Sequence, residues 1–337
     1  MKKRMFSFFS SVLTTVLILS GCSSSTPTRT NTQRADQKVT IKIAHESPAS
    51  HPKGIWADTF KKAVEEKSGG KISVEVFHQG SLYPKEQAAL EAVNQGIIQM
   101  SLGSTGYLSS IEPTFGVFDL PMLFPSQESL YKATDGKVGK ELLDKLEAKG
   151  LKGLGYVANV PLDLFSKSPI TSIDQISGQK IRVHTAELEK SVKTLGGNPI
   201  TMPASEVYMA LQQGVLQGVL TTVSYAAPNK LSEVVKNMTD IKISSIVYPI
   251  VINLDFWKGL SPENQKIIEE ATQVAIKANR DDLEQIMGKH LKTLQDGGVK
   301  IHKLSADEHA KWKTKLHSIY DEFKDKQLLE KVNQAIK

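Results

Sequence analysis

The first residues that could do chemistry are two histidines, His45 and His51, with Glu46 and Ser47 between them. Imidazole, carboxylate and hydroxyl groups at this spacing could form a metal site or a hydrolase-type cluster. Pro48 lies in the same stretch and Pro52 directly follows it, and histidines in a proline-containing loop are more often incidental. No Gly-x-Ser-x-Gly, His-Glu-x-x-His or P-loop pattern stands in the sequence. We therefore expect no enzyme, no catalytic residue, no metal ligand and no cofactor.

Arg182 is the residue best suited to bind an anion. Its guanidinium is a planar fork of donors that matches the two oxygens of a carboxylate, so it fixes orientation as well as charge. It lies toward the end of the segment Lys180–Val183, which predicts a strand. Open α/β sheets form ligand crevices at the ends of their strands. An ordinary surface ion pair is the alternative that this residue alone leaves open.

Cys22 is the only cysteine, and what precedes it is typical of an export signal. Three basic residues at positions 2–4 are followed by an apolar run, Met5–Leu19. That run is shorter than the roughly 20 residues that span a bilayer. The small pair Ser20-Gly21 before the cysteine resembles the lipobox of bacterial lipoproteins. The resemblance implies a signal peptide over residues 1–21 and a lipid on Cys22.

The segment after the cysteine begins Ser-Ser-Ser-Thr-Pro-Thr and offers no large apolar side chain that could pack. We expect residues 22–38 to form a flexible tether with an r.m.s. reach of roughly 20–25 Å. The folded body would then be extracytoplasmic, anchored to the cell membrane by the lipid and free to meet a membrane partner.

Net charge and chain length further limit the classes of protein to which this chain could belong. Residues 1–21 hold three basic residues and no acidic one, so without them the formal charge falls from +6 to +3. So small a charge predicts no nucleic-acid partner. A single cysteine allows no intramolecular disulfide, and about 300 residues bury enough surface without one. The length suggests two domains.

Hydrophobic patterning predicts alternating strands and helices. In the first half we expect strands over 39–44, 72–76 and 97–102, and helices over 55–64 and 86–94. In the second half we expect strands over 154–157, 164–165, 180–183, 215–220 and 246–254, and helices over 187–195 and 205–213. This order predicts two α/β lobes, each with a mostly parallel sheet covered by helices.

A long helix is predicted near the C-terminus. Ser261-Pro262 supplies an N-cap and a proline at the first helical position, and the pattern runs to about Gln295. Such a rod measures roughly 50 Å, so we expect it to brace both lobes. Ser305–Glu308 reads as a capping box that begins one more helix.

Five segments, in order, resemble the solute-binding proteins of TRAP transporters (the DctP type). They are His78–Leu82 with Gln99-Met100, Glu112–Phe124, Ile176–Val183, Met202–Val215 and Leu260–Glu263. They span nearly the whole mature chain. One such match would be weak, whereas five in register are specific.

The resemblance implies a two-lobed, periplasmic-binding-protein-like (Venus flytrap) α/β fold with a cleft that closes on ligand. Lobe I would comprise residues 39–160 plus about 247–285. Lobe II would comprise residues 161–246 plus about 286–337. The family implies capture of a small organic acid and its delivery to a TRAP permease in the membrane, by a protein that is usually a monomer.

The resemblance also implies the binding residues. Arg182 matches the family's ligand arginine, which pairs with a substrate carboxylate. The other position-matched pocket candidates are His45, Ser104, Tyr107, Ala204, Thr221 and Tyr248.

The remaining pocket departs from well-known members. A second family arginine maps near Leu162, where none stands, and Ser104 and Tyr107 replace charged residues of the sialic-acid-binding branch. The segment Val219–Thr222 also stands where the sialic-acid-binding branch has a polar segment. These differences argue against sialic acid and weaken the case for a dicarboxylate. A monocarboxylate, with an apolar or aromatic body, fits at least as well.

A second function would use the same pocket. A ligand-sensing receptor subunit for a sensor kinase or chemotaxis protein would have the same fold, so the sequence leaves that alternative open.

Overall fold

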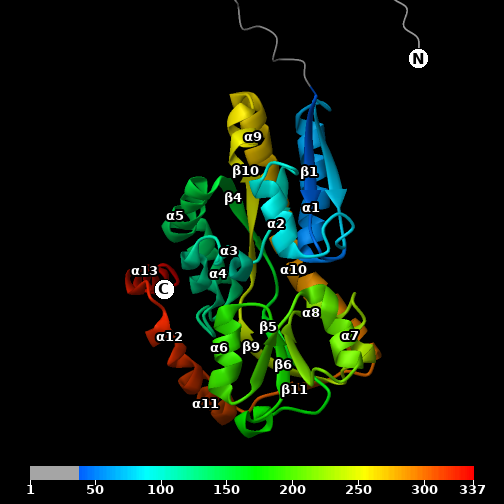
Figure 1. The fold of residues 1–337 in the computed structure, drawn as a ribbon, viewed down its shortest axis with the longest axis vertical. Coiled ribbons are helices and arrows are strands. Elements are labelled where there is room, and N and C mark those ends of the chain that lie inside the picture. The colour runs from blue at the N-terminus through cyan, green and yellow to red at the C-terminus, as the bar shows by residue number, and fades with distance from the viewer. Residues whose placement is uncertain (1–37) are drawn as a thin grey trace, which may run out of the picture. The chain divides into compact units, whose positions relative to one another are not determined.

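The computed structural model describes residues 38–337, which form one compact unit. The predicted signal peptide, Cys22 and nearly all of the tether lie outside the described residues. The strands of the unit form two separate sheets, here called sheet A and sheet B (Figure 1). The predicted two-lobed α/β fold is confirmed.

Sheet A has the strand order β2-β1-β3-β10-β4. Its strands are β1 (Val39–Ala44), β2 (Ile72–Phe77), β3 (Met100–Leu102), β4 (Leu151–Ala158) and β10 (Val247–Asn253). β1 runs parallel to β2 and β3, whereas β10 runs antiparallel to β3 and β4. The helices that precede or follow these strands are α1 (Pro52–Lys67), α2 (Glu86–Asn94), α3 (Thr105–Leu108), η1 (Pro113–Asp119), α4 (Gln127–Asp135), α5 (Lys137–Lys145), η2 (Leu146–Lys149) and α9 (Leu254–Gly259).

Sheet B has the strand order β11-β9-β5-β8-β6-β7. Its strands are β5 (Leu162–Ser166), β6 (Lys180–Val183), β7 (Asn198–Thr201), β8 (Gly218–Thr221), β9 (Asn237–Ser244) and β11 (Lys300–Lys303). The helices that precede or follow these strands in the chain are η3 (Ile173–Ile176), α6 (Ala186–Leu195), η4 (Ala204–Glu206), α7 (Val207–Gln212), α8 (Val223–Ala226), η5 (Leu231–Glu233), α11 (Ala306–His317), α12 (Ile319–Glu322) and α13 (Lys326–Ala335).

The expectation of mostly parallel sheets is confirmed, although each sheet also contains one antiparallel strand, β10 in sheet A and β5 in sheet B. β5 is antiparallel to β8 and β9, and β10 is antiparallel to both of its neighbours. β5 and β10 each enter straight from the other sheet, without the crossover helix that a parallel neighbour needs. The chain therefore crosses between the sheets at 159–161, at 245–246 and through the helices after β10.

Most predicted elements have bounds close to those observed. The strands over 39–44 and 180–183 and the helix over 86–94 match to the residue. β3 and β8 begin three residues later than predicted, because Ile97 and Val215 are apolar but exposed, at 59% and 45%. Their apolar side chains extended the pattern beyond the sheet.

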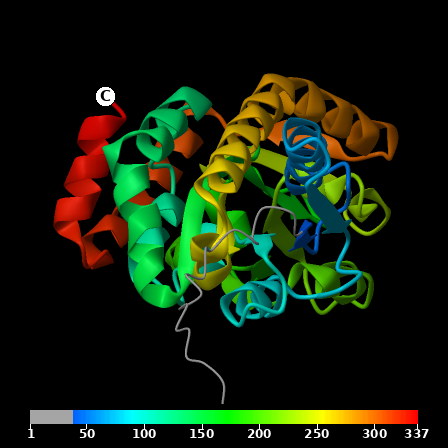
Figure 2. The same ribbon diagram turned by 90° about the horizontal axis from the view of Figure 1, so that it is seen from above.

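The long helix α10 (Pro262–Asp296) braces both sheets, as predicted. The Ser261 hydroxyl accepts a hydrogen bond from the Asn264 amide, which caps the helix. Its first half buries residues such as Ile268 in the core of sheet A, and its second half buries Leu283 in the core of sheet B. Figure 2 shows this gold-to-orange helix curving along one side of the unit.

Two C-terminal details differ from simple expectation. Ser305 caps α11 through the Glu308 amide, but the Glu308 carboxylate accepts from the Ile173 amide at 3.2 Å instead of completing the capping box. α13 contacts α4, α5 and η1, which belong to the predicted lobe I. The lobe boundaries stay a prediction.

Asp163 gives β5 a pH-dependent link to β9. Its carboxylate accepts hydrogen bonds from the amides of Ile241 and Lys242 at 3.1 and 3.0 Å, and burial raises its pKa from 3.8 to about 7. A carboxyl whose pKa is higher in the folded than in the unfolded protein stabilises the fold at pH values below the unfolded pKa. This contribution to stability is lost as the pH rises through the folded pKa. Unfolding free energy should therefore fall from about pH 4 to 7. Denaturant titrations should show Asp163→Asn flattening this slope; an unchanged slope would contradict the assignment.

Candidate ligand-binding site

A cavity of about 50 Å³ lies between elements of the two sheets. From the side of sheet A it is lined by Glu46, Ser47, His51, Pro84, Lys85, Glu86, Ser104, Tyr107, Ile246 and Tyr248. From the side of sheet B it is lined by Leu162, Arg182, His184, Pro203, Ala204, Thr221, Thr222 and Tyr225. A ligand here would touch both sheets at once.

Arg182 lies on β6, and its side chain reaches this cavity although the residue is only 4% exposed. Its Nε donates to the carbonyl oxygen of Met202 at 3.0 Å. Within residues 38–337 no carboxylate lies within ion-pair distance of it. Burial lowers its pKa, yet a guanidinium stays charged in proteins. The cavity therefore presents a desolvated cation whose terminal nitrogens are free for an anion.

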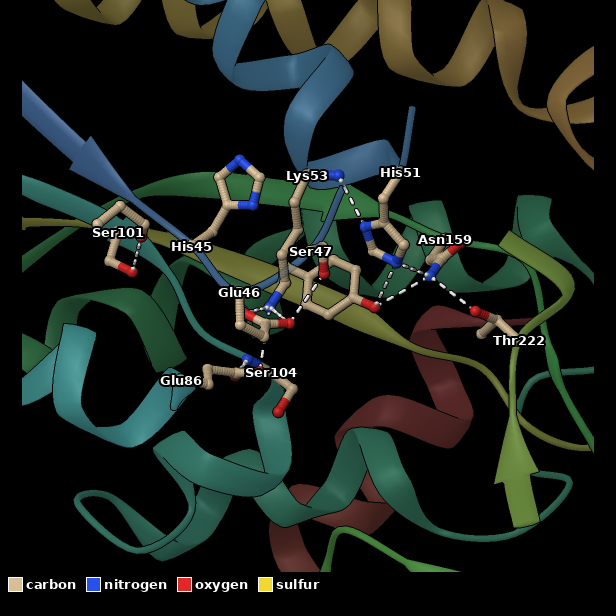
Figure 3. A network of polar contacts seen from close by, with 12 residues as sticks. His45, Glu46, Ser47, His51, Lys53, Glu86, Ser101, Ser104, Asn159 and Thr222 are labelled. Carbon is tan, nitrogen blue, oxygen red and sulfur yellow. Dashed lines mark hydrogen bonds and ion pairs between the residues drawn. The ribbon is translucent and has the colours of Figure 1, made fainter. Parts of the chain in front are cut away.

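Lys53 forms the centre of a second charged group, on the side of sheet A (Figure 3). It lies in the first turn of α1, and its side chain is fully buried. Its ammonium lies 3.1 Å from carboxylate oxygens of both Glu46 and Glu86, and 4.3 Å from the centre of the Tyr248 ring. Because one cation serves two acids, the carboxylates compete for its charge.

The two acids respond differently to that competition. Burial is the largest single effect on Glu46 and opposes its ionisation. The Lys53 ammonium, His45, the residue's own backbone amide and His51 together outweigh burial and lower the pKa of Glu46 to about 2. Burial raises the pKa of Glu86, and the charge on Glu46 adds to this effect. Glu46 is therefore the ionised partner of Lys53. Glu86 also accepts a hydrogen bond from the Ser104 amide, which fixes the start of α3.

Asn159 links the two sides of the cavity from the 159–161 crossover, where it is fully buried. Its Nδ2 donates to the Tyr248 hydroxyl at 2.9 Å and lies 3.2 Å from His51 Nε2. Its Oδ1 accepts from the Ser224 hydroxyl at 2.7 Å. One side chain thus ties α1 and β10 to α8 at the point where the chain passes between the sheets.

Two polar atoms near the cavity are buried without a hydrogen-bond partner among the described residues. They are Ser104 Oγ and His184 Nδ1, and both residues line the cavity. Burial lowers the pKa of His184 to about 3, so its ring is neutral at pH 7. A hydroxyl and a neutral imidazole can each pair with a polar ligand group.

Six of the seven predicted pocket residues come together at this cavity: Arg182, Ser104, Tyr107, Ala204, Thr221 and Tyr248. His45 does not. Its Nε2 lies 3.0 Å from Nδ1 of His78, and burial lowers its pKa to about 3. Figure 3 shows the side chains of His45 and Glu46 pointing in opposite directions, and of these two only Glu46 lines the cavity.

Several residues at the site escaped the sequence analysis, notably Lys53, Glu86, His184 and Tyr225. Only Lys53 carried a usable signal. A lysine in the first turn opposes the helix dipole, so it needs a carboxylate partner nearby. The other three depend on tertiary proximity alone.

A larger cavity of about 440 Å³ lies beside the crossovers, lined in part by Tyr131, Arg280 and Met287. Its arginine already pairs with both oxygens of Asp135, at 2.6 and 2.7 Å. It is therefore less suited to an anion. Over residues 38–337 no cluster of three or more potential metal ligands occurs, and no helix has the length and apolarity to cross a membrane.

Two mixed sheets, a bracing helix and a polar cavity between the sheets form the two-lobed fold that solved solute-binding proteins share. The sequence matches the family described as bacterial extracellular solute-binding protein, family 7 (DctP), over residues 43–327. The chain belongs to this family, whose members are the solute-binding proteins of TRAP transporters.

Individual relatives support the assignment. The chain is 34% identical over 299 residues to the C4-dicarboxylate-binding periplasmic protein DctP of Rhodobacter capsulatus, covering 86% of this chain and 88% of that protein. A TRAP periplasmic solute-binding protein from Sulfurospirillum deleyianum, solved with bound succinate, has a TM-score of 0.82 and 34% identity, covering 89% and 99% of the two chains. The sugar acid binding protein DctPAm from Advenella mimigardefordensis, solved in complex with galactonate, has a TM-score of 0.86 and 28% identity. The match covers 89% of this chain and 98% of that protein.

Proposed function

We propose that this protein captures a small organic acid between its two sheets and delivers it to a TRAP permease, without catalysing a reaction. The observation that carries the proposal is Arg182, a buried guanidinium at the cavity with no carboxylate partner in the described chain. A buried charge is costly unless it is paired. A ligand carboxylate would supply the missing partner in a bidentate pair.

The ligands of relatives agree with carboxylate capture. The printed descriptions name C4-dicarboxylates for the Rhodobacter protein, succinate for the Sulfurospirillum structure and galactonate for the Advenella structure. Each of these ligands carries at least one carboxylate. The head group that Arg182 would hold is thus common to all of them.

Binding would favour closure of the two lobes, because only the closed form lets a ligand touch residues of both sheets. Gly106 in α3 supports this proposal. A Cβ built there would lie 2.8 Å from Thr185 Cβ, at the start of α6. The two sides therefore approach closely next to Tyr107, which lines the cavity.

Gly106→Ala should weaken ligand binding about tenfold or more, because the added methyl group would hold α3 away from Thr185. Titration calorimetry measures this effect. Gly288→Ala in α10 is the matched control, since a Cβ there meets no atom within 4 Å. Equal affinities for the two variants would contradict the role of this contact in closure.

Anchoring remains part of the proposal. We infer from the sequence that Cys22 carries a lipid, that residues 22–38 act as a tether and that the protein works outside the cytoplasmic membrane as a monomer. A lipid anchor would keep the binder close to its permease.

The experiment that tests the function is a thermal-shift screen of the chain without residues 1–21 against C4-dicarboxylates, 2-oxo acids, aromatic acids, sugar acids and lactate. A ligand at 100 times its Kd should stabilise by about 2.7 kcal/mol. Stabilisation by an acid, but not by its amide or alcohol analogue, supports carboxylate capture. Stabilisation by neutral analogues alone would refute it.

A further inference from the structure

The cavity has opposite charges on its two sides. Arg182 supplies a cation from sheet B, whereas Glu46 and Glu86 supply carboxylates from sheet A. The side chains of these acids are 12% and 9% exposed. Neither lies within 4 Å of a nitrogen of Arg182, since their ion pairs are with Lys53. A ligand would therefore lie between a cationic side and an acidic side.

Among residues 38–337, no buried cation is available at the acidic side for a second ligand carboxylate. Lys53 is fully buried, does not line the cavity and is already 3.1 Å from both acids. Lys85 does line it, but its side chain is 59% exposed and lies 3.6 Å from Glu206. An ion pair between such a solvent-exposed lysine and a ligand carboxylate would contribute little to the binding free energy. A second carboxylate would meet acceptors of its own charge.

Hydroxyl groups match this side better than carboxylates or ammonium groups. Each ionised carboxylate offers about four lone-pair positions, so Glu46 has capacity beyond its bonds to Lys53 and Ser47. A hydroxyl can donate to such an acid and accept from Ser104 Oγ, which is buried without a partner and lines the cavity. An ammonium group would face the charge of Lys53 close behind the acids.

We propose that the ligand is a hydroxylated monocarboxylate, such as an aldonic acid, with its carboxylate on Arg182 and its hydroxyl groups donating to Glu46 and Glu86. Glu46 is then the specificity-determining residue that disfavours dicarboxylates. This inference rests on the proposed function, because it takes carboxylate capture by Arg182 as given.

The test is calorimetric titration of the chain without residues 1–21 with D-gluconate, succinate and L-alanine. Gluconate should bind at least tenfold more tightly than either of the others. In Glu46→Gln the affinity ratio of gluconate to succinate should fall at least tenfold, because one negative charge is removed. Glu75→Gln, an exposed acid on β2, is the matched control and should leave the ratio unchanged.

The outcomes separate this inference from the function beneath it. Succinate or alanine binding the wild type as tightly as gluconate would overturn the inference, whether or not Glu46→Gln folds. An unchanged ratio in a folded Glu46→Gln, judged by its melting temperature, would also overturn it. In both cases, binding that disappears in Arg182→Ala would leave carboxylate capture standing. Binding that survives Arg182→Ala would refute both proposals.

Discussion

Arg182→Ala should abolish the ligand-induced rise in melting temperature while leaving the ligand-free protein at least as stable as the wild type. Loss of one partner of a buried hydrogen-bonded charge pair costs about 2–5 kcal/mol of binding. Affinity should therefore fall by about 30-fold or more, by calorimetry. Ligand-free stability should not fall, because the variant removes a desolvated cation that has no carboxylate partner in the described chain.

Two further variants sharpen this result. Arg182→Lys keeps the charge but not the planar fork, so it should recover only part of the lost affinity. Arg280→Ala is the matched control, since this arginine pairs with Asp135 away from the cavity. It should leave affinity unchanged. Wild-type affinity in Arg182→Ala would remove Arg182 from the site.

Lys53→Met should lower the unfolding free energy by about 3–5 kcal/mol at neutral pH. The change leaves Glu46 and Glu86 buried without their cation, and breaking a buried pair carries a cost of that size. Urea denaturation measures it. Lys67→Met, in the same helix, breaks an exposed pair with Glu270 and should cost no more than about 1 kcal/mol.

The pH dependence of Lys53→Met provides an independent check. In the wild type the lowered pKa of Glu46 means that this acid stabilises the fold above pH 4.5, and the contribution is lost as pH falls toward 2. Without Lys53, burial raises the pKa of both Glu46 and Glu86. Lowering the pH should therefore protonate both acids in the variant and remove the destabilising buried charge. The stability difference should narrow below pH 4.5. A difference that is small at pH 7, or constant with pH, would contradict the buried ion cluster.

Much of the fold was readable from local pattern. The strand over 180–183, the helix over 86–94 and the long capped helix follow from apolar periodicity and from turn and cap residues, which act over a few positions. The reversed direction of one strand in each sheet was not readable in this way. β10 is antiparallel because the chain returns from sheet B without a crossover helix, and no residue within β10 encodes that route.

The residues of the binding site likewise fall into those that the sequence could predict and those that only the structure reveals. Arg182 could be predicted because a guanidinium near a strand end has a recognisable use, and Ser104, Tyr107 and Tyr248 followed from the family pattern. His45 does not line the cavity, and periodicity alone does not say which face of the chain meets it. Lys85, Glu206 and the acidic side formed by Glu46 and Glu86 needed the assembled structure.

The sequence by itself determined the α/β class and the family, and it predicted Arg182 as the residue that would hold a carboxylate. Only the tertiary structure decided that Lys53 is fully buried between two acids, one of them 33 positions away in the chain, and that Asn159 joins both sheets. Helices and strands arise from short-range preferences. The charge around a ligand depends on which distant side chains share a buried, low-dielectric space, and folding alone sets that.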